Sequence, residues 1–180
     1  MVPTIETARL RLRPWLASDR APFAELNADP ETMELMPTLL STEESDAFAD
    51  RIEAGLADRG WGLWAVEVRG EADFIGFTGL NPADFDAHFT PCVEIGWRLA
   101  RPAWGHGYAT EAATAVLAMA FDEIGLDEVV SFTSVGNARS RGVMEKIGLT
   151  HDPADDFDHP RLEVGHRLRR HVLYRGSAPP

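Results

Sequence analysis

The segment from Arg101 to Glu111 holds the residues whose types and spacing first suggest chemistry. It contains Gly105 and Gly107, and it lies between a predicted strand and the most regular helical pattern of the chain. Two glycines allow a tight turn, and they let the backbone approach a ligand without a Cβ in the way. The free N–H groups of the next helical turn and the positive end of its dipole favour an anion. The segment therefore predicts a site for a phosphate or a pyrophosphate.

Motif spacing narrows the kind of phosphate site. A P-loop needs the run G-x-x-x-x-G-K-[ST], and the sequence holds no such run. A dinucleotide-binding turn needs a third glycine where Thr110 stands. Its acidic residue, about twenty residues further on, would be Asp127 or Glu128, and both precede the next predicted strand instead of ending it. Neither pattern fits, and a G-x-G pair alone also occurs in turns for conformational reasons.

Apolar periodicity predicts the elements that must position this turn. Apolar residues at three- and four-residue intervals predict a helix from about 107 to 124, with Gly125 as its C-terminal glycine. Asn137 can cap a further helix that Gly148 ends. The other predicted elements are helices over 18–26 and 42–56 and strands over 9–13, 61–68, 74–80, 93–99, 129–133 and 167–175. This order indicates one mixed α/β domain over residues 1–180.

Composition limits the class of protein further. The 180 residues fit one domain, and 17 basic against 29 acidic residues give a net charge of −12. This charge argues against nucleic acid or an anionic membrane as a partner. Cys92 alone cannot form an internal disulfide. The longest run free of charged residues and strong breakers, about 112–121, is far too short to span a bilayer. The N-terminus lacks the pattern of a secretory signal, so a cytoplasmic protein is expected.

The glycine segment resembles the coenzyme A-binding motif of the GNAT superfamily of N-acetyltransferases, Q/R-x-x-G-x-G/A. Gly107 and Ala109 stand at its small positions, and Trp104 replaces the usual glutamine or arginine. The run W-G-H-G-Y-A-T-E-A is similar to the form found in the ribosomal-protein-alanine acetyltransferase (RimJ/RimL-like) branch. Four further stretches resemble that branch in the same order, at 7–13, 94–99, 137–149 and 170–174.

This resemblance implies a GNAT fold, with a mostly antiparallel mixed sheet of about six to seven strands and about four helices. It implies acetyl-CoA as co-substrate. Backbone N–H groups from Gly105 to Ala109 would bind the pyrophosphate, the splayed strand from Trp97 to Leu99 would pair with the pantetheine amides, and the Asn137 side chain would bind the pantetheine arm. The cofactor-binding residues implied are Trp97, Arg98, Leu99, Trp104, Gly105, His106, Gly107, Tyr108, Ala109 and Asn137.

The implied reaction needs a base for the amine and an acid for the departing thiolate. Glu94 is the candidate base, because strand alternation places it on one face with Gly96 and burial raises the pKa of a carboxyl. His159, whose ordinary pKa suits the task, and a water are the alternatives. Ser140, which the resemblance places near the coenzyme sulfur, is the candidate acid, with water sharing the role. The histidines lack a recognised zinc spacing, so no metal is expected.

The acceptor implied is a primary amine. Deprotonating an α-amine at pH 7 costs about 1 kcal/mol, against about 4–5 kcal/mol for a lysine, which favours a protein or peptide N-terminus. The alternatives are a small cationic amine of the polyamine or aminoglycoside type, and a module that senses acyl-CoA without catalysis. The partners expected are acetyl-CoA, the amine acceptor and, in a homodimer, a second copy of the chain. Neither nucleic acid nor a membrane is expected.

Overall fold

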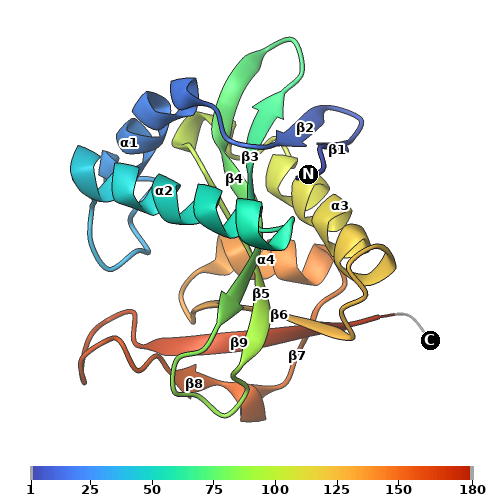
Figure 1. The fold of residues 1–180 in the computed structure, drawn as a ribbon. Coiled ribbons are helices and arrows are strands. Elements are labelled where there is room, and N and C mark those ends of the chain that lie inside the picture. The colour runs from blue at the N-terminus through green and yellow to red at the C-terminus, as the bar shows by residue number, and fades with distance from the viewer. Residues whose placement is uncertain (1, 179–180) are drawn as a thin grey trace.

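A computed structural model describes residues 2–178, which form a nine-stranded mixed sheet with helices packed against it (Figure 1). The strands are β1 (Ile5–Glu6), β2 (Leu10–Arg13), β3 (Leu63–Val68), β4 (Ala72–Ala83), β5 (Cys92–Leu99), β6 (Glu128–Ser134), β7 (Thr150–His151), β8 (Phe157–Asp158) and β9 (Arg170–Ser177). The helices are α1 (Arg20–Ala28), α2 (Thr42–Arg59), α3 (Tyr108–Asp122) and α4 (Ala138–Lys146). The mixed α/β architecture and its four helices are confirmed. None of these helices is both long and apolar enough to cross a bilayer.

The sheet contains one parallel pair of strands, and that pair is barely joined. The strand order is β1-β2-β3-β4-β5-β6-β9-β7, with β8 also on β9, and every pair but β5 with β6 is antiparallel. β4 and β5 pair continuously along β5, whereas β5 and β6 share only the pair Glu94 and Val130. The two parallel strands therefore diverge beyond Glu94, and this divergence is the predicted splay. It is called the opening below.

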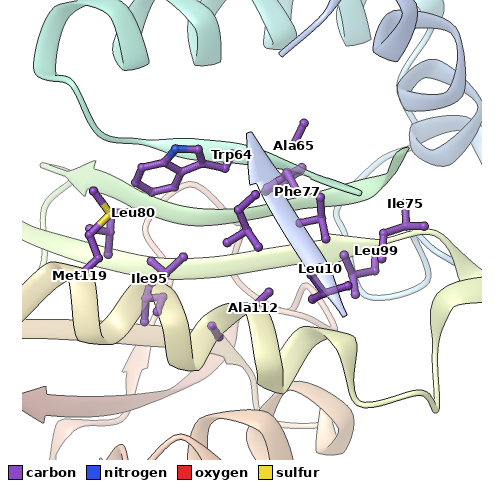
Figure 2. Packing of buried hydrophobic residues seen from close by; sticks show 14 of the residues in the cluster. Leu10, Trp64, Ala65, Ile75, Phe77, Leu80, Ile95, Leu99, Ala112 and Met119 are labelled. Atoms are coloured by element: carbon purple, nitrogen blue, oxygen red, sulfur yellow. The ribbon is translucent and has the colours of Figure 1, made fainter. Parts of the chain in front are cut away.

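Apolar side chains fix both faces of the sheet. On one face Phe77 of β4 meets the rings of Phe23 in α1 and Phe48 in α2, with ring centroids 6.0 and 5.9 Å apart. On the other face Leu80 and Ile95 point toward α3, as Figure 2 shows. The buried residues of α3 are mostly small, so this helix packs closely on β4 and β5. The packing fixes where the N-terminus of α3 lies.

The helices begin in two different ways. α2 and α4 begin with capping side chains, because Ser41 Oγ accepts from the Glu44 N–H and Asn137 Oδ1 accepts from the Ser140 N–H. α3 begins at Gly107, whose φ of 80° is left-handed, and no side chain caps it. The first N–H groups of α3 are therefore left without an internal acceptor, although this helix lies over the centre of the sheet.

Candidate active site

The glycine turn presents a row of unused hydrogen-bond donors. Gly105 and Gly107 have φ values of 83° and 80°, a region that favours glycine, as the sequence predicted. From Gly105 to Thr110, no backbone N–H finds an acceptor among residues 2–178, and the next N–H, of Glu111, returns to the Gly107 carbonyl at 3.0 Å. Donors concentrated at a helix N-terminus suit a phosphate group. The turn thus has the chemistry expected of a pyrophosphate site.

Arg9 and Glu111 hold the turn from the side. The Arg9 guanidinium donates to Glu111 Oε2 at 2.7 Å and to the His106 carbonyl at 2.9 Å, and it lies 4.8 Å from the Tyr108 ring centroid. Glu111 also accepts from Thr7 Oγ1 at 2.6 Å. The His106 ring stacks on Tyr108 at 5.3 Å. Sequence reasoning did not predict these contacts, here called the Arg9–Glu111 clasp, because Arg9 and Glu111 are about a hundred residues apart and belong to separate motifs.

The backbone of β5 directs polar groups into the opening. The Ala100 N–H donates to the Ile75 carbonyl of β4 at 2.8 Å. In an antiparallel pair, the backbone groups of every second residue before Ala100 therefore also bond to β4, and the backbone groups of the residues between them face β6. The Ile95 carbonyl indeed accepts from Ser131 Oγ at 2.8 Å. Farther along, the N–H and carbonyl of Trp97 face the opening, where no residue of β6 is in register with them. An unpaired strand edge of this kind can bond to the amides of an extended ligand.

Trp104 joins the glycine turn to both sides of the opening. Its Nε1 donates to the Leu99 carbonyl of β5 at 2.7 Å. Its ring lies 4.4 Å from the guanidinium carbon of Arg139 in α4 and 5.0 Å from that of Arg101. The indole therefore links β5 to α4, and the Leu99 carbonyl already accepts a hydrogen bond from it. The Leu99 N–H stays directed toward the opening.

Asn137 and Ser140 lie together at the start of α4. Asn137 Nδ2 donates to Thr133 Oγ1 at 2.8 Å and to Ser140 Oγ at 3.0 Å, while its Oδ1 accepts the Ser140 N–H at 3.2 Å. Both amide hydrogens of Asn137 are thus used, and only a lone pair of Oδ1 remains for a ligand. Ser140 Oγ is held as an acceptor, so its own hydrogen is free to be donated.

Glu94 lies deep on the face of β5 that is opposite α3. A Cβ added to Gly96 would stand 3.7 Å from Glu94 Oε1, so the carboxylate leans along the strand toward Gly96, on the face where the alternation predicted it. The side chain is half-buried, and nothing in the described part of the chain offsets its loss of water. Burial therefore raises its pKa from 4.5 to about 8. The carboxyl loses its proton, and becomes able to accept one from an amine, as the pH rises toward 8.

His159, the alternative base, has a different environment. Its ring lies 4.8 Å from the ring of Phe85 and 5.1 Å from that of His171, and its Nδ1 accepts the Arg161 N–H at 3.3 Å. Burial, with His171 and Arg161 adding to it, lowers the His159 pKa to about 4. His159 is therefore neutral at pH 7 but a weak base. Across residues 2–178 no group of histidine, cysteine and acidic side chains could hold a metal ion.

Arg98 is the one predicted residue of the cofactor strand whose side chain lies away from α3. Its backbone is opposite Phe77 of β4, and its Nη1 donates to Asn27 Oδ1 of α1 at 2.6 Å. The side chain thus shares the Glu94 face of β5. The other predicted residues border the opening or the glycine turn, so the structure brings the turn, Trp97 to Leu99, Asn137 and Ser140 to one region.

Comparison with known proteins gives a family match and several relatives. The family described as "Acetyltransferase (GNAT) domain" matches residues 9–150. The "FsC-acetyl coenzyme A-N(2)-transacetylase" of Aspergillus fumigatus is 35% identical over 159 residues, which cover 83% of this chain and 66% of that protein. The chain thus spans just under two thirds of this fungal relative.

Two solved structures share the fold. An acetyltransferase from Agrobacterium tumefaciens is 27% identical with a TM-score of 0.77, over 98% of this chain and 95% of that one. RimJ of Mycobacterium smegmatis, solved in complex with CoA-disulfide, is 21% identical with a TM-score of 0.78, over 98% of this chain and 88% of that one. These likenesses extend over nearly the whole described sheet.

Proposed function

Because the chain belongs to the GNAT family and is an acetyl-CoA-dependent acetyltransferase, we propose that its acceptor is a primary amine, in the first place the N-terminal α-amine of a protein or peptide. The run of unused N–H donors from Gly105 to Thr110 beside the opening supports acetyl-CoA as the co-substrate. The observation that carries the choice of an amine acceptor is the half-buried Glu94 carboxyl on β5, whose pKa of about 8 lies near that of an α-amine. Acetyl-CoA supplies the acetyl group as a thioester, and the amine replaces the thiol.

The donor set fits the parts of this co-substrate. The glycine turn offers N–H groups to the pyrophosphate, and the Trp97 backbone offers one donor and one acceptor to the pantetheine amides. The Leu99 N–H is a further donor, while the Leu99 carbonyl is already bonded to Trp104. A backbone N–H in this stretch of β5 would stabilise negative charge on the oxygen of the reacting carbonyl.

Two side chains would move protons. Glu94, with a pKa of about 8, would take the proton from the attacking amine, directly or through a water. Ser140 would give its hydroxyl hydrogen to the departing sulfur, because Asn137 already donates to Ser140 Oγ and leaves that hydrogen unused. The low His159 pKa favours Glu94, or a water, over His159 as the base.

The choice of an α-amine rests on proton energetics. An α-amine has a pKa near that of Glu94, whereas a lysine holds its proton about 3 kcal/mol more tightly at pH 7. RimJ, named above, supports a CoA ligand for this fold. The name of the fungal relative supports N-acetylation of another kind of acceptor. The alternatives are therefore a small amine of the polyamine or aminoglycoside type and a non-catalytic acyl-CoA sensor.

An acceptor panel tests the proposal. Peptides with free N-termini, the same peptides blocked at the N-terminus but carrying a lysine, spermidine and an aminoglycoside are each incubated with acetyl-CoA. Thiol release and the product mass are measured. Transfer to the free N-termini, with little to the blocked peptides, is expected. Exclusive transfer to a polyamine or aminoglycoside would contradict the peptide acceptor. Tight acetyl-CoA binding with no transfer to any amine would favour the sensor.

A further inference from the structure

The Arg98 guanidinium is a deep cation without an anionic partner. It donates to Asn27 Oδ1 at 2.6 Å, lies 3.8 Å from Met36 Sδ, and lies over the rings of Phe48 and Phe77 at 5.7 and 5.5 Å. No carboxylate between residues 2 and 178 lies within 4.0 Å of it. A guanidinium carries five N–H donors, so several remain for a ligand.

Arg13, a buried arginine elsewhere in the fold, differs from Arg98 because it is paired with carboxylates. Arg13 makes two hydrogen bonds to Asp19, at 2.7 and 2.9 Å, and a third to Glu67 at 3.2 Å. This fold therefore compensates a buried guanidinium elsewhere. Burial lowers the Arg98 pKa to about 10, so the side chain is still charged at neutral pH. An uncompensated charge in such a place costs stability unless a ligand offsets it.

Glu94 lies on the same face of the same strand as Arg98, with Gly96 between them. Burial is the one influence that shifts its pKa, and it forms no ion pair with Arg98. Both side chains are half-buried and keep partial access to solvent, and burial shifts the pKa of each. Between them, a Cβ on Gly96 would meet nothing within 4 Å except Glu94 Oε1. There is consequently open space over Gly96, between the two side chains.

We propose that Arg98 binds a carboxylate of the acceptor while Glu94 faces its amine, so that the enzyme acts on amines that carry an anionic group. This inference rests on the proposed function. Gly96 and the open space over it separate the two side chains along the strand, so we place the amine and the carboxylate of the ligand several bonds apart. That spacing does not fit the adjacent groups of a free α-amino acid. It fits a peptide N-terminus followed closely by an aspartate or glutamate.

Matched acceptors test the assignment. Peptides that carry glutamate at the second, third or fourth position are compared with otherwise identical peptides that carry glutamine there, by kcat/KM from thiol release. For a charge-assisted contact, the glutamate peptide is expected to be preferred by about 10- to 100-fold at one position. A second arm compares 5-aminopentanoate with its amide, which tells a small amino carboxylate from a peptide as the source of the carboxylate.

Variants connect this preference to Arg98. In Arg98→Met the ratio of the two kcat/KM values is expected to fall toward one, chiefly through KM, and Arg98→Lys should retain part of it. Arg51→Met is the matched control, because the exposed Arg51 lies over the same Phe48 ring at 5.5 Å and is expected to leave the ratio unchanged. Should Arg98→Met fail to fold, the wild-type preference and the Arg98→Lys ratio still decide the matter.

Two failures are distinguishable. Transfer to no amine at all would overturn the proposed function. Transfer with equal kcat/KM for carboxylate and amide acceptors in both arms would overturn only the role of Arg98, as would a preference that Arg98→Met leaves intact.

Discussion

Replacement of Glu94 by glutamine should change how stability depends on pH. The folded-state pKa of about 8 lies above the usual 4.5, so between these values the folded protein keeps a proton that the unfolded chain releases. Stability is therefore present at low pH and is lost as pH rises, by up to about 1.4 kcal/mol per pH unit. The whole interval corresponds to at most about 5 kcal/mol. Partial solvent access to the side chain lowers this limit.

Glutamine cannot ionise, so Glu94→Gln should gain stability relative to wild type by about 2–4 kcal/mol between pH 5 and pH 8. Other titratable groups near this face are common to both proteins: the His159 pKa is lowered to about 4, the His171 pKa is also lowered, and the Cys92 thiol pKa is raised to about 11. Cys92 thus titrates above the tested range. The histidine contributions cancel in the difference.

Urea unfolding at pH 5, 6, 7 and 8 measures this difference, and thermal unfolding should show it as roughly 5–15 °C in relative Tm. Glu25→Gln is the control, because Glu25 is exposed on α1 and its replacement should leave the pH dependence unchanged. Parallel curves for wild type and Glu94→Gln would refute the reasoning, since they would mean that the Glu94 carboxylate ionises as it does in water.

Three further predictions concern the transfer reaction and the turn. Glu94→Gln should lower kcat by about 100-fold or more with acetyl-CoA affinity nearly intact; an unchanged kcat and pH–rate profile would exclude Glu94 as the base. Ser140→Ala should slow single-turnover thiol release by about 10-fold without loss of stability, and equal rates would leave Ser140 with a packing role. Gly107→Ala should cost about 1–2 kcal/mol in urea unfolding because of its left-handed φ, and should weaken acetyl-CoA binding in calorimetric titration. The control Gly142→Ala, in α4 with open space around its Cβ position, should not destabilise the protein, and equal effects of the two substitutions would contradict the prediction.

The sequence predicted best where local rules decide the structure. The apolar stripe of α3 and the Asn137 cap of α4 depend on neighbours in the chain, and both are present. The left-handed glycines of the turn also follow from local geometry. The strand predicted over 74–80 extends farther, because β4 continues through Ala83 in register with β5.

The sequence did not predict the contacts between segments that are far apart in the chain. β1, β7 and β8 have two residues each, too few to form a periodic pattern, and they exist because β2 and β9 offer free edges. The clasp of Arg9 on Glu111 joins segments that no local rule connects. The isolation of Arg98 could not be predicted either, because it depends on which carboxylates fold elsewhere.

Thermal unfolding with acetyl-CoA, with NAD as control, tests the central assignment most directly. A ligand at 100 times its dissociation constant adds about 2.7 kcal/mol, which corresponds to roughly 5–10 °C for a chain of this size. The unused donors of the glycine turn and the β5–β6 opening predict this shift with acetyl-CoA and none with NAD. No shift with acetyl-CoA, in protein shown by mass spectrometry to carry no bound CoA, would contradict the account.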